Sequence, residues 1–412
     1  MSSSDNSCEK DGSSITISPP ISPSETTSDT ELETLPTLPL LKVSTLQAIK
    51  ETRAFHSKKA WMTFFENRIP PLLYYGEANK VPIMSSEIYS TAEDWFILGD
   101  IHGDYYALRN TVEHIKSICP EFRLIFLGDL IDRGPHPMEC LWYLLNLAND
   151  YPQRILWIAG NHDVGITYTE QSDQFHSTVY PSEFINHLNH IDSWAPFRRM
   201  FGLEYIELVA NLPRAVLLPD GTLITHGGFP LIDLQDQISD TNNNVAWLNS
   251  ANALQDFTWT RISRYKMKLP NRASTGCSYG FDDFAKFCEV TKTFFPTKQL
   301  VTGHNHPEGG YDKHPNWLVN PALTLTGYGF DDIYEKPEAF NSLYRQSLII
   351  GRCCQDKLPD VIEVLVDRSD LNDFFTNEII QLFAKTLPID QKATIESPVI
   401  KTSFMSWAHG GK

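Results

Sequence analysis

Five short clusters in this sequence carry side chains that can bind metals or move protons. They read GDIHG, GDLIDRG, GNHD, HGG and GHNH, and begin at positions 99, 128, 160, 226 and 303. In each cluster a glycine stands beside a carboxylate, amide or imidazole group, which lets the backbone turn sharply and approach a bound group closely. A lone Gly-Asp pair is ordinary turn sequence. Five such clusters in one chain indicate one shared site.

The donor types suit transition metals. In Asp100-x-His102 the two side chains point to the same side of an extended segment, so both can reach one ion, and His304-x-His306 repeats this spacing. Imidazole and carboxylate groups together suit Mn, Fe or Zn better than Ca.

Each cluster follows, at once or after a single residue, a short apolar run that has the length and content of a buried strand. These runs lie at 95–98, 123–127, 154–158, 222–225 and 299–302, and amphipathic helical stretches lie at 104–118, 137–148 and 282–290. Strands that alternate with helices predict an α/β core. Ligands bind outside the carboxyl ends of the strands in open α/β sheets, so the five clusters should converge. The later runs 347–351 and 361–366 have no helix between them and predict an antiparallel continuation of a sheet.

The order of the clusters resembles the calcineurin-like metallophosphoesterase superfamily. More narrowly it resembles divergent, bacterial-type PPP phosphoprotein phosphatases, because Asp132–Gly134 (DRG) is the PPP-specific part. The segments 210–213 (ANLP) and 226–230 (HGGFP) follow in the family's order. The resemblance covers about 95–367. It implies the family's fold, a central β-sandwich of mixed sheets flanked by helices.

The resemblance also implies a site for two metal ions, Mn in the first place, with Fe or Zn as alternatives. Asp100 and His102 would bind the first metal, and Asp129 would bridge both. Asn161, His226 and His304 would complete the second. A hydroxide that bridges the two ions would attack phosphorus directly, without a covalent enzyme intermediate.

Three further roles follow from the same resemblance. His162 would be the general acid that protonates the leaving oxygen, and Asp132 would orient it. Arg133 would hold the substrate phosphate with its planar fork, assisted by Asn161.

Two assignments stay open at this point. The second phosphate-binding arginine is either Arg272 or Arg261, and His306 is either an additional ligand of the first metal or a polar loop residue. The chain also departs from eukaryotic PPP enzymes around GNH, where Ala159 and Asp163 stand in place of Arg and Glu.

Composition excludes several other classes of protein. The chain has 412 residues and a net charge of −17, which disfavours non-specific nucleic-acid binding and a basic membrane-surface anchor. No apolar stretch is long enough to span a membrane, and no secretory signal peptide is visible. Seven irregularly spaced cysteines indicate a reducing compartment.

We expect four regions along the chain. Residues 1–36 read as a disordered acidic tail rich in Ser, Thr and Pro, and 37–94 as a helical lead-in. Residues 95–367 form the catalytic domain, and 368–412 a C-terminal helix and tail.

The predicted function is that of a metal-dependent protein phosphatase acting on phosphoserine or phosphothreonine, with phosphotyrosine as a further substrate. The alternatives are a diadenosine tetraphosphate hydrolase, since such enzymes often carry GNHD, or another small-molecule phosphoesterase. A phosphoprotein is the expected partner, and the sequence names no regulatory partner. A cytoplasmic location is expected, with export as an effector into a host cell as a second hypothesis.

Overall fold

The structure is a computed structural model of the whole chain. It describes the following residues: 37–38, 80–86, 89, 94–134, 136–151, 154–189, 195–231, 245–263, 269–270, 276–307, 310–314, 322–325, 347–354 and 357–365. The expected acidic tail, most of the helical lead-in and the C-terminal helix lie outside these residues, as does Arg272.

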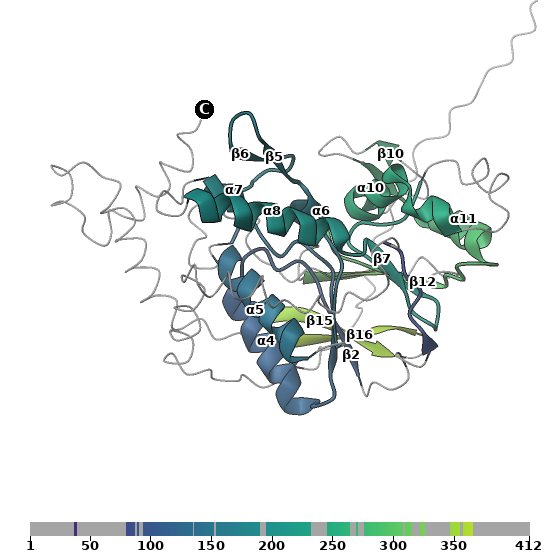
Figure 1. Cartoon of the computed structure of the whole chain (residues 1–412). Coiled ribbons are helices and arrows are strands. Elements are labelled where there is room, and N and C mark those ends of the chain that lie inside the picture. The colour runs from purple at the N-terminus through teal and green to yellow at the C-terminus, as the bar shows by residue number, and fades with distance from the viewer. Residues whose placement is uncertain are drawn as a thin grey trace, which may run out of the picture. The chain divides into compact units, whose positions relative to one another are not determined.

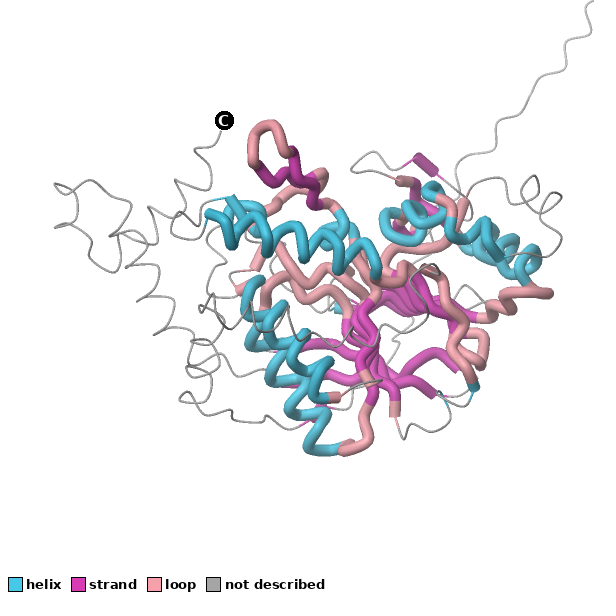
Figure 2. Tube along the Cα trace, in the orientation of Figure 1, coloured by secondary structure: helices cyan, strands magenta, loops and turns pink. Residues whose placement is uncertain are grey.

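Two mixed β-sheets form the centre of the catalytic region (Figures 1 and 2). The first has the strand order β1-β16-β15-β2-β3-β4 and the second β13-β14-β12-β8-β7. The strands of the first sheet are Thr37–Leu38, Lys357–Leu365, Ser347–Cys354, Trp95–Leu98, Arg123–Phe126 and Ile155–Trp157. Those of the second are Tyr311–His314, Ala322–Leu325, Gln299–Thr302, Thr222–Thr225 and Ala215–Leu217. All five strands predicted to precede the clusters are confirmed.

Strand alternation divides each sheet between two cores. In β2, Trp95 and Ile97 belong to the cluster between the sheets, whereas Phe96 and Leu98 face the helices. The inner cluster also takes Val301 from β12 of the second sheet. The sheets therefore pack face to face as a sandwich, as predicted.

Helices cover both outer faces of the sandwich (Figure 1). The helices α4 (Tyr105–Ile118) and α5 (Pro137–Asp150) pack on the first sheet, where Leu108 and Leu144 join Phe96 in one core. The helices α10 (Ala251–Trp259) and α11 (Phe281–Thr291) pack on the second sheet. Asp104 caps the N-terminus of α4, because its carboxylate accepts a hydrogen bond from Ala107 N at 3.0 Å.

Strand direction brings the clusters to one region. β2, β3 and β4 run parallel, and so do β8 and β12, so the clusters leave each sheet at its carboxyl edge. The late strands β15 and β16 pair antiparallel, and β15 pairs antiparallel with β2, as the absence of an intervening helix predicted.

An inserted segment lies between the third and fourth clusters. It follows α6 (Asn161–Val164), which carries most of the third cluster, and holds the hairpin β5 (Ile166–Thr169) and β6 (Gln174–Ser177) and the helices α7 (Phe184–Asn189) and α8 (Ala195–Asn211). Further along the chain, a 3-10 helix at Val245–Asn249 precedes α10. A small sheet then follows α10 and has the strand order β10 (Leu269–Pro270), β11 (Cys277–Tyr279) and β9 (Arg261–Ile262). None of the helices in the described part of the chain is both long and apolar enough to cross a membrane.

Candidate metal centre

The first two clusters are joined by their backbones. Ile101 N and His102 N both donate to the carbonyl oxygen of Asp129, at 3.0 and 2.8 Å. His102 and Asp129 adopt positive φ angles of 46° and 51°, which non-glycine residues rarely occupy. The expected reason for the convergence of Asp100 and His102 was therefore wrong: a left-handed turn, not an extended segment, brings their side chains together.

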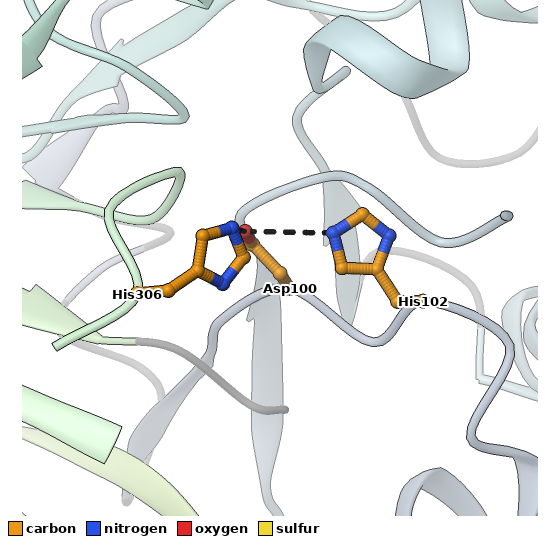
Figure 3. Close-up of side chains that lie close together, drawn as sticks. All are labelled: Asp100, His102 and His306. Carbon is orange, nitrogen blue, oxygen red and sulfur yellow. Dashed lines mark ion pairs between the residues drawn. The ribbon is translucent and has the colours of Figure 1, made fainter. Parts of the chain in front are cut away.

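Asp100, His102 and His306 form the first group of donors that could hold a metal ion (Figure 3). His102 Nε2 lies 3.9 Å and His306 Nε2 3.8 Å from the same oxygen, Oδ2 of Asp100. His102 Nδ1 contacts the carbonyl oxygen of Ile131 at 2.9 Å, which fixes the ring with Nε2 toward the group. Asp100 and His102 are fully buried.

Asp129, His226 and His304 form a second group. His226 Nε2 lies 3.3 Å from Asp129 Oδ2 and 3.0 Å from Asn161 Oδ1. The other ring nitrogen of His226 contacts the carbonyl oxygen of Leu127 at 2.8 Å, so this imidazole is also oriented by a backbone acceptor.

Two buried atoms of these groups support a bound cation. Asp100 Oδ2 and His304 Nε2 make no hydrogen bond with any described residue. Buried polar atoms normally have a partner, and a metal ion would supply one. The chemistry of the donors therefore fits a site for two ions. Asp129 is close to both groups of donors, because it also forms a third group with His102 and His162.

The carboxylates set the charge of the centre. Burial raises the pKa of Asp100, and Asp129 adds to this shift. Burial alone would lower the pKa of His226, but the carboxylates of Asp129 and Asp100 outweigh burial and raise it to about 9. The buried oxygens therefore attract positive charge, either a proton or a cation.

The other two buried imidazoles favour their neutral, ligand-competent form. Burial and the guanidinium of Arg133 hold the pKa of His102 well below its usual range. Burial and Arg261 do the same for His304. Neutral imidazole is the form that binds metals.

His162 lies beside this centre and is held by two carboxylates. Its Nδ1 is 2.8 Å from Asp132 Oδ2, and its backbone nitrogen donates to Asp129 Oδ1 at 2.9 Å. Burial raises the pKa of Asp132, and its hydrogen bond to His162 opposes the shift. With Nδ1 on Asp132, Nε2 is the ring nitrogen that can exchange a proton with another group.

The guanidinium of Arg133 lies between two histidines. Its Nη2 lies 3.4 Å from His162 Nε2, and its Nη1 lies 3.1 Å from His306 Nε2. The guanidinium therefore lies next to one member of the first group of donors, His306, and next to His162.

Glycine is required where the clusters touch. A Cβ on Gly134 would lie 2.0 Å from the carbonyl oxygen of His102, and one on Gly160 would lie 2.1 Å from Asp129 Oδ1. The close approach expected of these clusters is therefore observed.

Arg261 is brought to the centre, but through a backbone contact. Its Nη1 donates to the carbonyl oxygen of His304 at 2.5 Å. Of the two arginines that could make the second phosphate contact, Arg261 alone falls within the described residues.

Sequence reasoning missed the contribution of Asp163. Its carboxylate is fully buried and accepts hydrogen bonds from the backbone nitrogens of Asp129, Leu130 and Gly160, at 2.8, 3.1 and 2.9 Å. The signal that could have found it is its place directly after His162 in GNHD, where eukaryotic PPP enzymes carry a longer carboxylate.

A model of the calcineurin-like phosphoesterase family matches residues 96–308, more than half of the 412-residue chain. The chain belongs to the calcineurin-like phosphoesterase family. It is accordingly a hydrolase of phosphoesters with the mixed α/β metallophosphoesterase fold, and its more specific relatives are distant phosphatases of the PPP type.

Two such relatives show how low the sequence identity is. This phosphoesterase is 26% identical over 231 residues to a catalytic subunit of protein phosphatase 2A from Dictyostelium discoideum, across 56% of this chain and 67% of that protein. It is 27% identical over 236 residues to a PP2A-like serine/threonine-protein phosphatase of Candida albicans, across 56% of this chain and 51% of that protein. The chain thus spans only about half the length of the second relative.

A solved protein serine/threonine phosphatase from Saccharomyces cerevisiae also matches, with a TM-score of 0.46 and 14% identity. That match covers 77% of this chain and 90% of the other.

Proposed function

We propose that this calcineurin-like phosphoesterase is a protein phosphatase that hydrolyses phosphoserine and phosphothreonine, and phosphotyrosine where the side chain can reach. The observation that supports this most strongly is the group formed by Arg133, His162 and Asp132 beside two clusters of metal-type donors. Both distant relatives are protein phosphatases by name, one a protein phosphatase 2A and the other a serine/threonine-protein phosphatase, which favours a phosphoprotein substrate.

In this proposal seven side chains would hold two cations, with Mn first and Fe or Zn as alternatives. Asp129 would be shared, and the ligands divide into Asp100, His102 and His306 on one side and Asn161, His226 and His304 on the other. When bound, the cations would supply Lewis acidity and an activated water nucleophile.

The protein's own residues would handle the phosphate and the leaving group. Arg133 would turn its fork from the two histidines to the phosphoryl oxygens, which accept hydrogen bonds and balance its charge. His162 would give the proton on Nε2 to the leaving oxygen, while Asp132 keeps Nδ1 protonated and the ring in place. Arg261 and Arg272 are the candidates for a second phosphate contact, and Asn161 would assist.

A reducing, cytoplasmic location is part of the same proposal. Cys140 and Cys288 are buried thiols outside any disulfide, and burial raises the pKa of both, so they act as small apolar residues.

A substrate panel tests the proposal. The purified chain, loaded with Mn²⁺, is assayed against matched phosphoserine, phosphothreonine and phosphotyrosine peptides and against diadenosine tetraphosphate, with identification of every product. Release of inorganic phosphate from the first two peptides is expected. Nucleotide release from the dinucleotide, with the peptides left intact, would instead establish the small-molecule alternative. His176→Ala, at an exposed position on β6, is the matched control for histidine variants of the site.

A further inference from the structure

Glu183, which directly precedes helix α7, and Phe184, its first residue, each make a hydrogen bond to the turn that carries Asp132 and Arg133. The backbone nitrogen of Arg133 donates to Glu183 Oε2 at 2.8 Å. The backbone nitrogen of Phe184 donates to Asp132 Oδ1 at 2.9 Å. These contacts join residues about fifty positions apart, and they reach the turn from outside the five clusters.

The turn needs such support because its backbone is strained. Asp132 and Arg133 have φ angles of 66° and 62°, two successive non-glycine residues in the left-handed region. Such conformations persist only where the surroundings over-determine them. Within the turn, Gly134 N contacts the carbonyl oxygen of Asp132 at 2.6 Å, and the bonds from α7 fix the turn from the other side.

The two oxygens of Asp132 serve different partners. Oδ2 lies 2.8 Å from His162 Nδ1, and Oδ1 accepts from Phe184 N. The plane of the carboxylate is therefore set by α7, and this plane orients the imidazole of His162. Arg133 is also held at two points. Its backbone nitrogen donates to Glu183, and its guanidinium contacts His162 and His306.

Helix α7 is itself anchored away from the site. Phe184 is fully buried against Tyr205 of α8, with ring centroids 5.0 Å apart. Leu188 is fully buried in the same core, and Asn189 exchanges two hydrogen bonds with the backbone of Phe175 on β6. The inserted segment therefore fixes the backbone next to Glu183, so that its carboxylate stays in place to accept the hydrogen bond from Arg133 N.

We propose that Glu183 is a positioning residue, which holds the backbone of Arg133 so that its guanidinium faces the phosphoryl group. This inference rests on the proposed role of Arg133 in binding phosphate. Glu183 is partly exposed and its carboxylate accepts a hydrogen bond from the backbone of Arg133, so we expect its effect to pass through Arg133.

The test compares Glu183→Ala and Glu183→Gln with wild type in the full-length, Mn²⁺-loaded chain. Affinity for inorganic phosphate is measured by calorimetry, and kcat and KM are measured on a phosphomonoester. For Glu183→Ala we expect about tenfold weaker phosphate binding and about tenfold higher KM, the size associated with one charge-assisted hydrogen bond. Glu183→Gln keeps an oxygen that can accept from Arg133 N, so it should recover most of the affinity. Glu207→Ala, an exposed glutamate of α8, removes the same charge from the same segment and should match wild type.

A double-mutant cycle shows whether the effect passes through Arg133. In the Arg133→Ala background, Glu183→Ala should have no further effect on phosphate affinity. If Glu183→Ala binds phosphate as wild type does, or weakens it equally in both backgrounds, the positioning role is wrong. If Arg133→Ala itself binds phosphate as wild type does, the proposed role of Arg133 is wrong and the positioning role with it. Calorimetry keeps both results measurable whichever phosphoester the enzyme hydrolyses.

Discussion

Oδ2 of Asp163 lies 2.8 Å from the backbone nitrogen of Asp129 and accepts its hydrogen bond. The same carboxylate accepts from the backbone nitrogens of Leu130 and Gly160, so it joins the second and third clusters. Burial, followed by the charge of Asp129, raises the pKa of Asp163 to about 7. Asp163 therefore fixes the backbone from which Asp129 and His162 reach the centre.

The Asp163→Asn variant should be less stable and bind metal less well. An amide offers one acceptor oxygen, and its NH₂ group would face a backbone N–H, which leaves a buried donor without a partner. We expect a loss of about 1–3 kcal/mol in the free energy of unfolding and weaker Mn²⁺ binding. Denaturant unfolding and metal titration measure both quantities. Asp150→Asn, at the exposed end of α5, is the control. Equal stability of the two variants would contradict the role of Asp163 in holding the backbones of the second and third clusters.

The Asp129→Ala variant should lose turnover and metal binding together. Asp129 contacts His226 and His102 with the same oxygen, at 3.3 and 3.6 Å, so its removal takes a donor from both groups. We expect a roughly thousandfold or greater fall in kcat. Metal content after dialysis, read beside the rate, is the measurement. An unchanged rate would show that the two groups do not form one catalytic centre.

His162→Ala should separate proton transfer from metal binding. Because its Nδ1 lies on Asp132, we expect His162 to act through Nε2 on the leaving group. The variant should keep its metal and lose about 10²–10⁴-fold in kcat on a poor leaving group such as an alkyl phosphate. On p-nitrophenyl phosphate, whose leaving group needs no proton, the loss should be much smaller. Since His162 also lies within one group of metal-type donors, loss of metal would identify it as a ligand instead.

The strands and most cluster contacts could be predicted because their signals are local. A run such as 299–302 has an apolar residue on each face, Leu300 and Val301, and the structure buries all four residues of β12 between a helix layer and the other sheet. Since parallel strands end at one edge, the sequence also predicted that the clusters would converge, whereas which donors share an ion was implied by the family resemblance alone.

The contacts that hold the donors could not be predicted in this way. Asp163 reaches Asp129 across 34 positions and Glu183 reaches Arg133 across 50. Nothing in the local pattern names the partner of a carboxylate, because the partner is a backbone N–H that every residue except proline carries. The left-handed turns at His102 and Asp132 were likewise hidden, since tertiary contacts and not residue type select them.

The first group of donors, Asp100, His102 and His306, is tested most directly by asking whether His306 binds metal. Its Nε2 lies 3.8 Å from Asp100 Oδ2 and its ring stacks on His102 with centroids 5.9 Å apart, a position from which it could be a third ligand. The same nitrogen lies 3.1 Å from Arg133 Nη1, which means that a cation on His306 would release Arg133 for phosphate.

We therefore expect His306→Ala to weaken one of two Mn²⁺ binding steps by about tenfold or more, at least the effect of losing an outer partner of a metal ligand. The other step should change little, because Asp129, His226 and His304 remain. Calorimetric titration of the metal-free chain with Mn²⁺ resolves the two steps, and His176→Ala, exposed on β6, should titrate as wild type does. Two unchanged steps in His306→Ala would make His306 a polar loop residue that serves Arg133 alone. Weakening of both steps to the same degree would instead show that the two groups bind as one coupled unit.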